Sequence, residues 1–240
     1  MQTSLPYDVN AQPPLPGIAP LDPAQWLIAD EAFAGQMRLR DQLLAEAREA
    51  VLQMDACARE AAVELLDMVL DIRHPGAFGQ VTRADGVEVV IDRDDPLATL
   101  GHLVQEDFCL LHKIGKVHVL TGAVLCFPAS WMLAEKFMAP LIAIHDPVQE
   151  YDPSLARRVQ RLFDGVRAGR PMWRFNALWY EDPALFQPRQ SQMRRQRHAA
   201  DTAAYLRSER QSILRLPKTD AVVFSIHTFV VPRSAVVRTA

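Results

Sequence analysis

Residues 105–151 read QEDFCLLHKIGKVHVLTGAVLCFPASWMLAEKFMAPLIAIHDPVQEY, and this stretch decides the fold. Two runs rich in β-branched and apolar residues, 105–112 and 117–126, flank the tetrapeptide KIGK. Gly115 in that tetrapeptide can adopt a positive φ, so the pattern predicts an antiparallel hairpin. The stretch therefore indicates a sheet that is built from hairpins.

A proline-framed histidine follows the hairpin. Ser130 is a residue type that caps helices, which predicts a helix from Trp131. His145 then lies between Pro140 and Pro147. Two fixed φ angles stiffen the backbone around it, as an axial metal ligand aimed into an apolar pocket requires. A histidine among apolar residues is also commonly a structural hydrogen-bonding residue, and the spacing does not choose between these interpretations.

The rest of the chain predicts an α+β domain. Six prolines between residues 5 and 23 favour an extended or polyproline-like segment. We expect residues 1–28 to form a proline-rich arm packed on the body, and residues 29–240 to form a single domain. The periodicity predicts helices at 30–71 (two helices), 96–102, 154–167 and 190–214, a hairpin at 81–91, and strands at 172–179 and 221–231. An antiparallel sheet with helices gathered on one side is the expected architecture.

Charged residues fall on the apolar side of the last predicted helix. At about 100° per residue, Arg207, Glu209 and Arg210 share the arc of Leu206 and Leu214. Charges on a core-facing arc are costly unless they are paired or bound to a charged group. The arginines suit the anionic groups of a ligand, and the glutamate suits a cation. An internal Arg–Glu network explains the same pattern equally well.

Composition excludes several classes of protein. The net charge is −3 and the basic residues are scattered, which is not typical of a nucleic-acid-binding protein. No apolar run approaches the roughly 20 residues that a membrane span needs, and no secretion signal is recognisable, so we expect a cytoplasmic protein. The three cysteines, Cys57, Cys109 and Cys126, form neither a CxxC pair nor a zinc pattern.

Several short motifs recur in a fixed order along the chain. They are Leu5-Pro6-Tyr7, Gln105-Glu106-Asp107, Cys126-Phe127-Pro128, Ile144-His145-x-Pro147-Val148, Leu206-Arg207-x-Glu209-Arg210, Arg215-Leu216-Pro217 and Ile226-His227-Thr228. In this combination the chain resembles the haem-dependent oxidative N-demethylase family, which is related to the haem subunit of dimethylamine monooxygenase.

The resemblance implies a PAS-like haem-binding fold and a monooxygenase subunit. Such a subunit would bind haem b, with His145 as the ligand of the iron, and use O₂ to N-demethylate a small secondary amine with release of formaldehyde. Arg207 and Arg210 would hold the haem propionates, and Glu209 would act as the catalytic residue that meets the substrate ammonium.

Electrons for this chemistry are expected from a separate flavin or iron–sulfur reductase. The chain has no GxGxxG motif and no iron–sulfur cysteine pattern. The basic run at 190–197 either docks such an acidic partner or is a solvated helix start.

Other ligands and a second function stay open. Cys126 ranks below His145 as an iron ligand, because a buried cysteine without a nearby cation keeps a high pKa. His102 and His227 are weaker rivals. A non-catalytic haem-binding or small-ligand sensor module of the same fold is the alternative function, and Gln149 and Ala177, which depart from the family's pattern, favour it.

Overall fold

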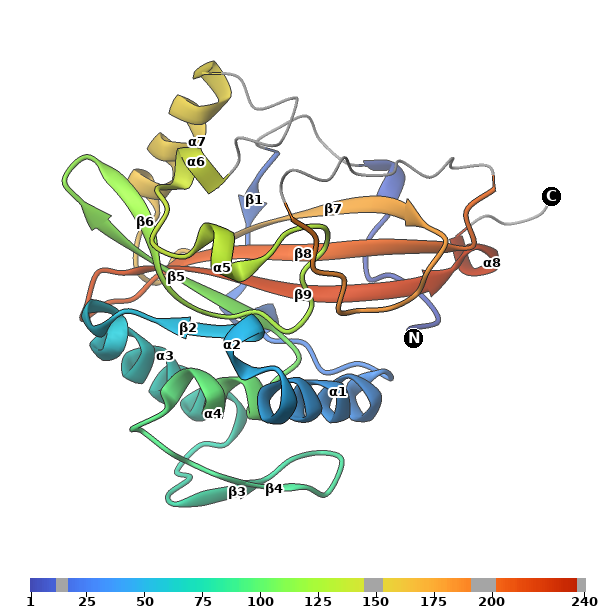
Figure 1. Cartoon of the computed structure of the whole chain (residues 1–240), viewed down its shortest axis with the longest axis horizontal. Coiled ribbons are helices and arrows are strands. Elements are labelled where there is room, and N and C mark those ends of the chain that lie inside the picture. Colours follow the sequence, from blue (N-terminus) through green and yellow to red (C-terminus); the bar gives the residue numbers. More distant parts are fainter. Residues whose placement is uncertain (12–16, 145–152, 191–201, 237–240) are drawn as a thin grey trace.

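The computed structural model describes residues 1–11, 17–144, 153–190 and 202–236, with the backbone alone at 153–156 (Figure 1). Within these ranges, seven strands form one sheet in the order β1-β7-β8-β9-β5-β6-β2, and two more form a separate hairpin, β3-β4. The strands are β1 Ala19–Pro20, β2 Leu52–Met54, β3 Gln80–Thr82, β4 Glu88–Val90, β5 Asp107–Ile114, β6 Val117–Val124, β7 Met172–Tyr180, β8 Tyr205–Arg215 and β9 Val222–Pro232. The helices are α1 Phe33–Glu46, α2 Arg48–Val51, α3 Arg59–Arg73, α4 Pro96–Leu103, α5 Leu133–Lys136, α6 Leu141–Ile144, α7 Pro153–Gly165 and α8 Arg233–Val236.

The hairpin predicted in the opening stretch is confirmed. β5 and β6 pair antiparallel, and Gly115 has a φ of 63° in the turn between them. The apolar strand near the carboxyl end, β9, lies between β8 and β5 and is buried along most of its length. The mixed α+β class and the antiparallel sheet therefore follow from the sequence pattern.

The prediction that the helices gather on one side of the sheet is wrong. Val223 of β9 packs in a core with residues of α1, α3 and α4, whereas its neighbour Val222 packs in a second core with Phe163 of α7. Successive side chains of a strand point to opposite faces, so helices cover both faces. Figure 1 shows α1, α3 and α4 below the sheet and α6 and α7 above it. The two faces are called here the α1 face and the α7 face.

The helix predicted up to Leu214 is also wrong over its described part, because residues 205–215 form β8. Leucine, arginine, glutamate and glutamine are good helix formers, but such propensities amount to a few tenths of a kcal/mol per residue. β8 instead pairs along its length with β7 on one side and β9 on the other. The ladder bonds on both sides override the local preference, and the helical arc of Arg207, Glu209 and Arg210 does not exist.

Two smaller predictions need correction. Ser130 does not cap a helix, because it has a φ of 68° and α5 begins only at Leu133, with Met132 at its N-cap. The hairpin predicted at 81–91 exists as β3-β4, but it forms a sheet of its own and does not join the main one.

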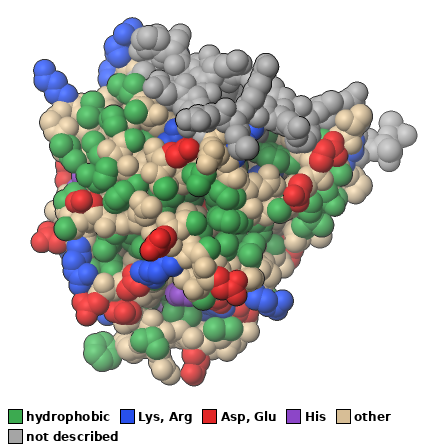
Figure 2. Space-filling view, in the orientation of Figure 1, with side chains coloured by type: hydrophobic (Ala, Val, Ile, Leu, Met, Phe, Trp, Pro, Cys, Tyr) green, Lys and Arg blue, Asp and Glu red, His purple; other side chains and the backbone are tan. Residues whose placement is uncertain are grey.

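The amino-terminal residues pack on the α1 face. Gln2, Leu21 and Trp26 are buried there, although two single 3₁₀ turns, Val9–Ala11 and Pro23–Gln25, interrupt the expected extended chain. On the face shown in Figure 2, acidic and basic side chains lie intermixed where the helices of the α1 face are found. In the described ranges, no helix has both the length and the apolar character that a bilayer crossing requires.

Candidate functional site

A small cavity lies on the α7 face of β7 and β8. Its volume is about 70 Å³, and the residues that line it are Ala129, Asn176, Leu178, Tyr180, Arg207 and Glu209. The strand register explains the grouping, because Asn176 lies directly opposite Glu209 and Leu178 lies directly opposite Arg207. Residues that face each other across a ladder share one face of the sheet, so β7 and β8 together present these side chains.

Glu209 is held by one carboxylate oxygen. Its Oε2 accepts hydrogen bonds from Asn176 Nδ2 at 3.0 Å and from Gln211 Nε2 at 3.1 Å. Asn176 also fixes the backbone, since its Oδ1 accepts from the Glu209 N–H at 3.1 Å. The nearest cation to Oε1 is Arg207 Nη2 at 3.9 Å, which is beyond hydrogen-bonding distance. Oε1 is therefore the oxygen that remains available to a ligand.

Arg207 is anchored by backbone carbonyls. Its Nη2 donates to the carbonyl of Phe127 at 2.6 Å, and its Nη1 donates to that of Leu185 at 2.9 Å. The side chain is almost fully buried, and within the described ranges its Nε has no hydrogen-bond partner. The guanidinium thus ties β8 to the segment that follows β6 and leaves one N–H unpaired beside the cavity.

Two of the motifs quoted above meet next to this segment. Asp107 Oδ1 and Oδ2 accept from the backbone N–H groups of Cys126 and Phe127, both at 2.8 Å. Arg40 of α1 donates to Asp107 Oδ1 at 2.6 Å, and both side chains are buried. Phe127 is therefore fixed through its N–H by Asp107 and through its carbonyl by Arg207, so the buried ion pair sets the position of the cavity wall at Ala129.

Arg210 lies on the opposite face of the sheet from Arg207 and Glu209. Its Nη1 donates to the carbonyl of Trp26 at 3.2 Å, and its guanidinium lies 5.3 Å from the ring centroid of Trp173. Burial lowers the pKa of Arg210, although the negative charge of Glu106 opposes that shift. The sequence analysis placed both arginines at one ligand; the alternation of β8 separates them.

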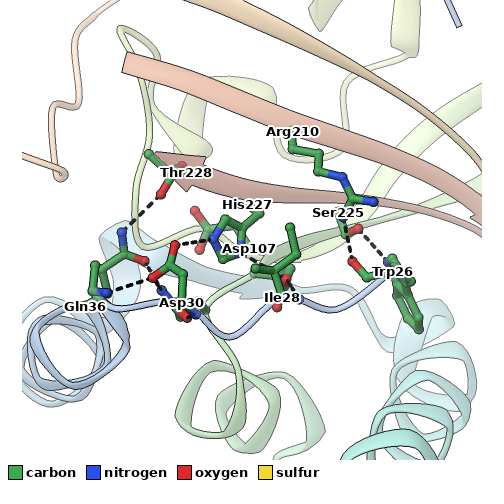
Figure 3. Close-up of polar contacts among 12 residues, drawn as sticks. Trp26, Ile28, Asp30, Gln36, Asp107, Arg210, Ser225, His227 and Thr228 are labelled. Carbon is green, nitrogen blue, oxygen red and sulfur yellow. Dashed lines mark hydrogen bonds and ion pairs between the residues drawn. The ribbon is translucent and has the colours of Figure 1, made fainter. Parts of the chain in front are cut away.

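On the α1 face, His227 lies between the partly buried carboxylate of Asp30 (Figure 3) and the buried carboxylate of Glu106. Its Nδ1 lies 3.0 Å from Glu106 Oε1, and its Nε2 lies 3.1 Å from Asp30 Oδ2. Gln105 Nε2 also donates to Asp30, and the backbone N–H of Ile28 donates to Glu106. This group, the His227 cluster, fastens the segment around Asp30 to β9 and to the start of β5.

In the His227 cluster, burial and the contacts between the residues shift the pKa values of His227 and Asp30 in opposite directions. Burial by itself lowers the pKa of His227, but the hydrogen bonds and charges of Asp30 and Glu106 raise it above its ordinary value. For Asp30, burial by itself raises the pKa, but hydrogen bonds from His227, Gln105 and Gln2 bring it well below the ordinary range. These contacts therefore favour the imidazolium form of His227 and the carboxylate form of Asp30.

We expect the free energy of unfolding to decrease as the pH rises, because His227 in this cluster loses its proton. A raised histidine pKa contributes stability that is complete below the ordinary value near 6.5 and is lost as the pH rises through the folded-state pKa. Urea midpoints measured at pH 6 and pH 9 should therefore drop more for the wild type than for His227→Gln, which cannot titrate. Equal drops in the two proteins would show that His227 is not charged in the fold.

Several residues considered as iron ligands are engaged elsewhere. Both ring nitrogens of His227 have carboxylate partners, and His102 Nδ1 lies 2.6 Å from Asp41 Oδ1. Burial raises the pKa of the Cys126 thiol to about 12, so it stays protonated at neutral pH. His145 lies outside the described residues, and its role stays a prediction.

The sequence analysis missed Asn176 as a partner of Glu209 and missed the pairing of His227 with Asp30 and Glu106. A period of two was present in the sequence, because the even positions of residues 206–214 are apolar or small except for Arg210, whereas the odd positions 207, 209, 211 and 215 are charged or amide residues. That alternation would have placed Arg207, Glu209 and Gln211 on one face. The partners of His227 come from segments far apart in sequence, so no local pattern indicates them.

Comparison with known protein families confirms the family resemblance. Residues 17–239 match the family described as haem-dependent oxidative N-demethylase, alpha subunit-like. Among curated proteins, no match to the chain is found. The family match spans nearly the whole chain and includes both cavity strands and the buried ion pair behind them. This chain therefore belongs to the haem-dependent oxidative N-demethylase, alpha subunit-like family.

Proposed function

We propose that this chain is the haem-binding subunit of a monooxygenase that N-demethylates a small secondary amine. In the overall reaction the amine, O₂, two electrons and two protons give the demethylated amine, formaldehyde and water. One oxygen atom of O₂ enters formaldehyde and the other leaves as water. A separate flavin or iron–sulfur reductase supplies the electrons, because this chain carries neither cofactor's motif.

The way in which the Glu209 carboxylate is held beside the cavity supports an amine substrate. One of its oxygens is fixed by Asn176 and Gln211, and the other is left without a hydrogen-bond donor beside a small cavity. A carboxylate held in this way is positioned to accept an N–H from an ammonium ion. Ala129 and Leu178 supply apolar surface on the same wall, which suits the N-methyl group.

The described residues do not by themselves fit a haem. The cavity at Glu209 has about 70 Å³, whereas cofactor pockets span roughly 300–1,000 Å³. A larger open hollow of about 620 Å³ carries Glu60, Glu64 and Asp67, an acidic wall that suits neither propionates nor an apolar macrocycle. In the same ranges, no cluster of three His, Cys, Asp or Glu residues is arranged to hold a metal ion. These residues therefore bind and orient the amine, and the haem requirement rests on the family and on His145.

The strand order supports the PAS-like part of the proposal. The β5-β6 hairpin lies beside β9, the last strand of the β7-β8-β9 meander, so the order across the sheet is β6-β5-β9-β8-β7. A first hairpin set against the last strand of a three-stranded meander is the arrangement expected of a PAS-like sheet. The amino-terminal contacts on the α1 face similarly support the proposal that residues 1–28 are an arm on one domain, 29–240.

We expect Glu209→Gln to weaken amine binding and to leave haem uptake nearly unchanged. The amide oxygen can still accept from Asn176 and Gln211, but the amide nitrogen then faces the cavity with a donor in place of an acceptor. A charge-assisted contact of about 1.5–3 kcal/mol is lost, which corresponds to at least tenfold in affinity. The measurement is a titration of the haem-loaded protein with dimethylamine, followed by its absorption spectrum.

Glu88→Gln is the matched control, because Glu88 is exposed on the separate β3-β4 hairpin. It should bind amine like the wild type. If Glu209→Gln binds amine as tightly as this control, Glu209 is not the ammonium site, and the amine-oxidation proposal loses the observation that supports it.

A further inference from the structure

Positive charge exceeds negative charge on the wall that carries the cavity, where Arg207 is buried and Arg174 is partly buried. Arg174, Arg207 and Glu209 all lie on the α7 face, since Arg174 is two residues before Asn176 and opposite Gln211. Arg174 Nη1 donates to Gln211 Oε1 at 3.2 Å, and Gln211 in turn donates to Glu209. Two guanidinium groups therefore share a single carboxylate among the described residues of this wall.

Both guanidinium groups keep unused donors. The Nε atoms of Arg174 and Arg207 are buried, and neither has a hydrogen-bond partner among the residues that the structure describes. Buried charges are normally paired, and a buried N–H without a partner is costly. The Arg207 Nη2 lies 3.9 Å from Glu209 Oε1, too far for a direct bond. Glu209 and Arg207 are therefore not bonded to each other. Among the described residues, Glu209 Oε1 remains as an acceptor and Arg207 Nε as a donor beside the cavity.

The charge balance distinguishes two kinds of secondary amine. A dialkylammonium ion would satisfy Glu209 but add a further positive charge to a wall that already has an excess. A zwitterion would place its ammonium at Glu209 and its carboxylate toward Arg207, which leaves the wall no more positive than before. Water occupies about 10–15 Å³ of such a volume, so a cavity of about 70 Å³ has room for a molecule of a few heavy atoms.

We propose that the cavity binds a small N-methyl amino acid, with Glu209 Oε1 accepting its ammonium N–H and the Arg207 guanidinium holding its carboxylate. This inference rests on the proposed function, because it names the substrate class of the same site. Arg174 adds the second positive charge behind Gln211, and Asn176 keeps Glu209 turned toward the cavity.

Ligand-observed NMR on the full chain, with and without haem, tests the inference without any turnover. The probes are N-methylglycine, dimethylammonium chloride and sodium acetate. We expect N-methylglycine to bind about tenfold or more tighter than either of the others, because each of those satisfies only one of the two charged partners. Equal or tighter binding of dimethylammonium, or no binding of any probe, overturns the inference.

Variants separate the two charged contacts. Arg207→Gln should bring N-methylglycine down to the affinity of dimethylammonium, whereas Glu209→Gln should weaken both. Because Arg207 also donates to the backbone carbonyls of Phe127, Ala184 and Leu185, Arg174→Gln serves as a second variant that should weaken the binding of N-methylglycine alone. Arg59 is an exposed arginine at the start of α3 that pairs with Asp94. Arg59→Gln removes the same charge far from the site and should leave the affinity for both ligands unchanged.

The outcomes also separate this inference from the proposed function. Preferential binding of N-methylglycine together with a haem-loaded protein that releases no aldehyde from any amine would leave the inference standing and remove the enzyme. Aldehyde release from dimethylamine with no preference for N-methylglycine in the NMR titration would do the reverse. An unchanged preference in both arginine variants would contradict the assignment of the carboxylate.

Discussion

Arg40→Met should destabilise the protein by about 3–5 kcal/mol, the cost typical of removing one partner from a buried ion pair. Arg40 is fully buried, and its guanidinium donates to Asp107 and to the carbonyls of Gly101, Gln105 and Glu106. Methionine fills much of the volume but leaves the Asp107 carboxylate without its cation. The measurement is the urea unfolding free energy at neutral pH.

An exposed ion pair provides the matched control. Arg48 of α2 pairs with Asp95 at 2.7 Å, and both side chains are more than a third accessible. Arg48→Met should cost no more than about 1 kcal/mol. A loss in Arg40→Met as small as in Arg48→Met would mean that the buried pair does not hold α1 to the β5 and β6 ends.

The same variant has a consequence at the cavity. Asp107 fixes the N–H of Phe127, and the carbonyl of Phe127 accepts from Arg207. In the folded fraction of Arg40→Met we therefore expect weaker amine binding as well, although Arg40 touches no residue of the cavity lining. This coupling links the motif at 105–107 to the proposed substrate site.

His145→Ala should abolish tight haem binding and leave the apoprotein folded. The expectation comes from the proline-framed sequence around His145, and the family match supplies the haem dependence but no ligand residue. Two rival iron ligands are engaged elsewhere, which supports the choice of His145. His227 lies between two carboxylates, and the Cys126 thiol stays protonated. The measurement is a haem titration followed by the Soret band, with circular dichroism as the check on folding.

His118 is the rival that this experiment must exclude. Its Nδ1 lies 2.8 Å from Gln160 Nε2, but its Nε2 is buried and has no partner in the part of the chain that the structure describes. An unaltered Soret band in His145→Ala, together with its loss in His118→Ala, would identify His118 of β6 as the ligand of the iron. If neither variant loses the band, a histidine ligand at either position is refuted.

The sequence predicted those parts of the fold that local patterns determine. Gly115 and its flanking apolar runs defined the β5-β6 hairpin, and the apolar run of β9 indicated a central strand. β8 was mistaken for a helix because its leucine, arginine and glutamine residues favour helix locally, while the ladders that decide its structure come from β7 and β9.

The candidate site was predicted in part, and for a reason that the structure corrects. Arg207 and Glu209 do lie together at the cavity, because they are two residues apart on a strand. Arg210 was included only by the helical period, and the strand turns it toward Trp26 on the other face. Asn176 and Asp30 became partners of Glu209 and His227 through contacts between distant segments, which one sequence does not reveal.

A single turnover of an amine with a ¹³C-labelled N-methyl group tests directly whether the haem-loaded chain carries out N-demethylation. The full chain, loaded with haem and supplied with chemical reductant and O₂, is mixed with ¹³C-methyl dimethylamine or ¹³C-methyl N-methylglycine, and the products are followed by NMR. We expect labelled formaldehyde in an amount close to that of the haem from the wild type, and less of it from Glu209→Gln at the same, non-saturating amine concentration. Haem-loaded wild-type protein that binds either amine and yields no labelled formaldehyde would contradict it.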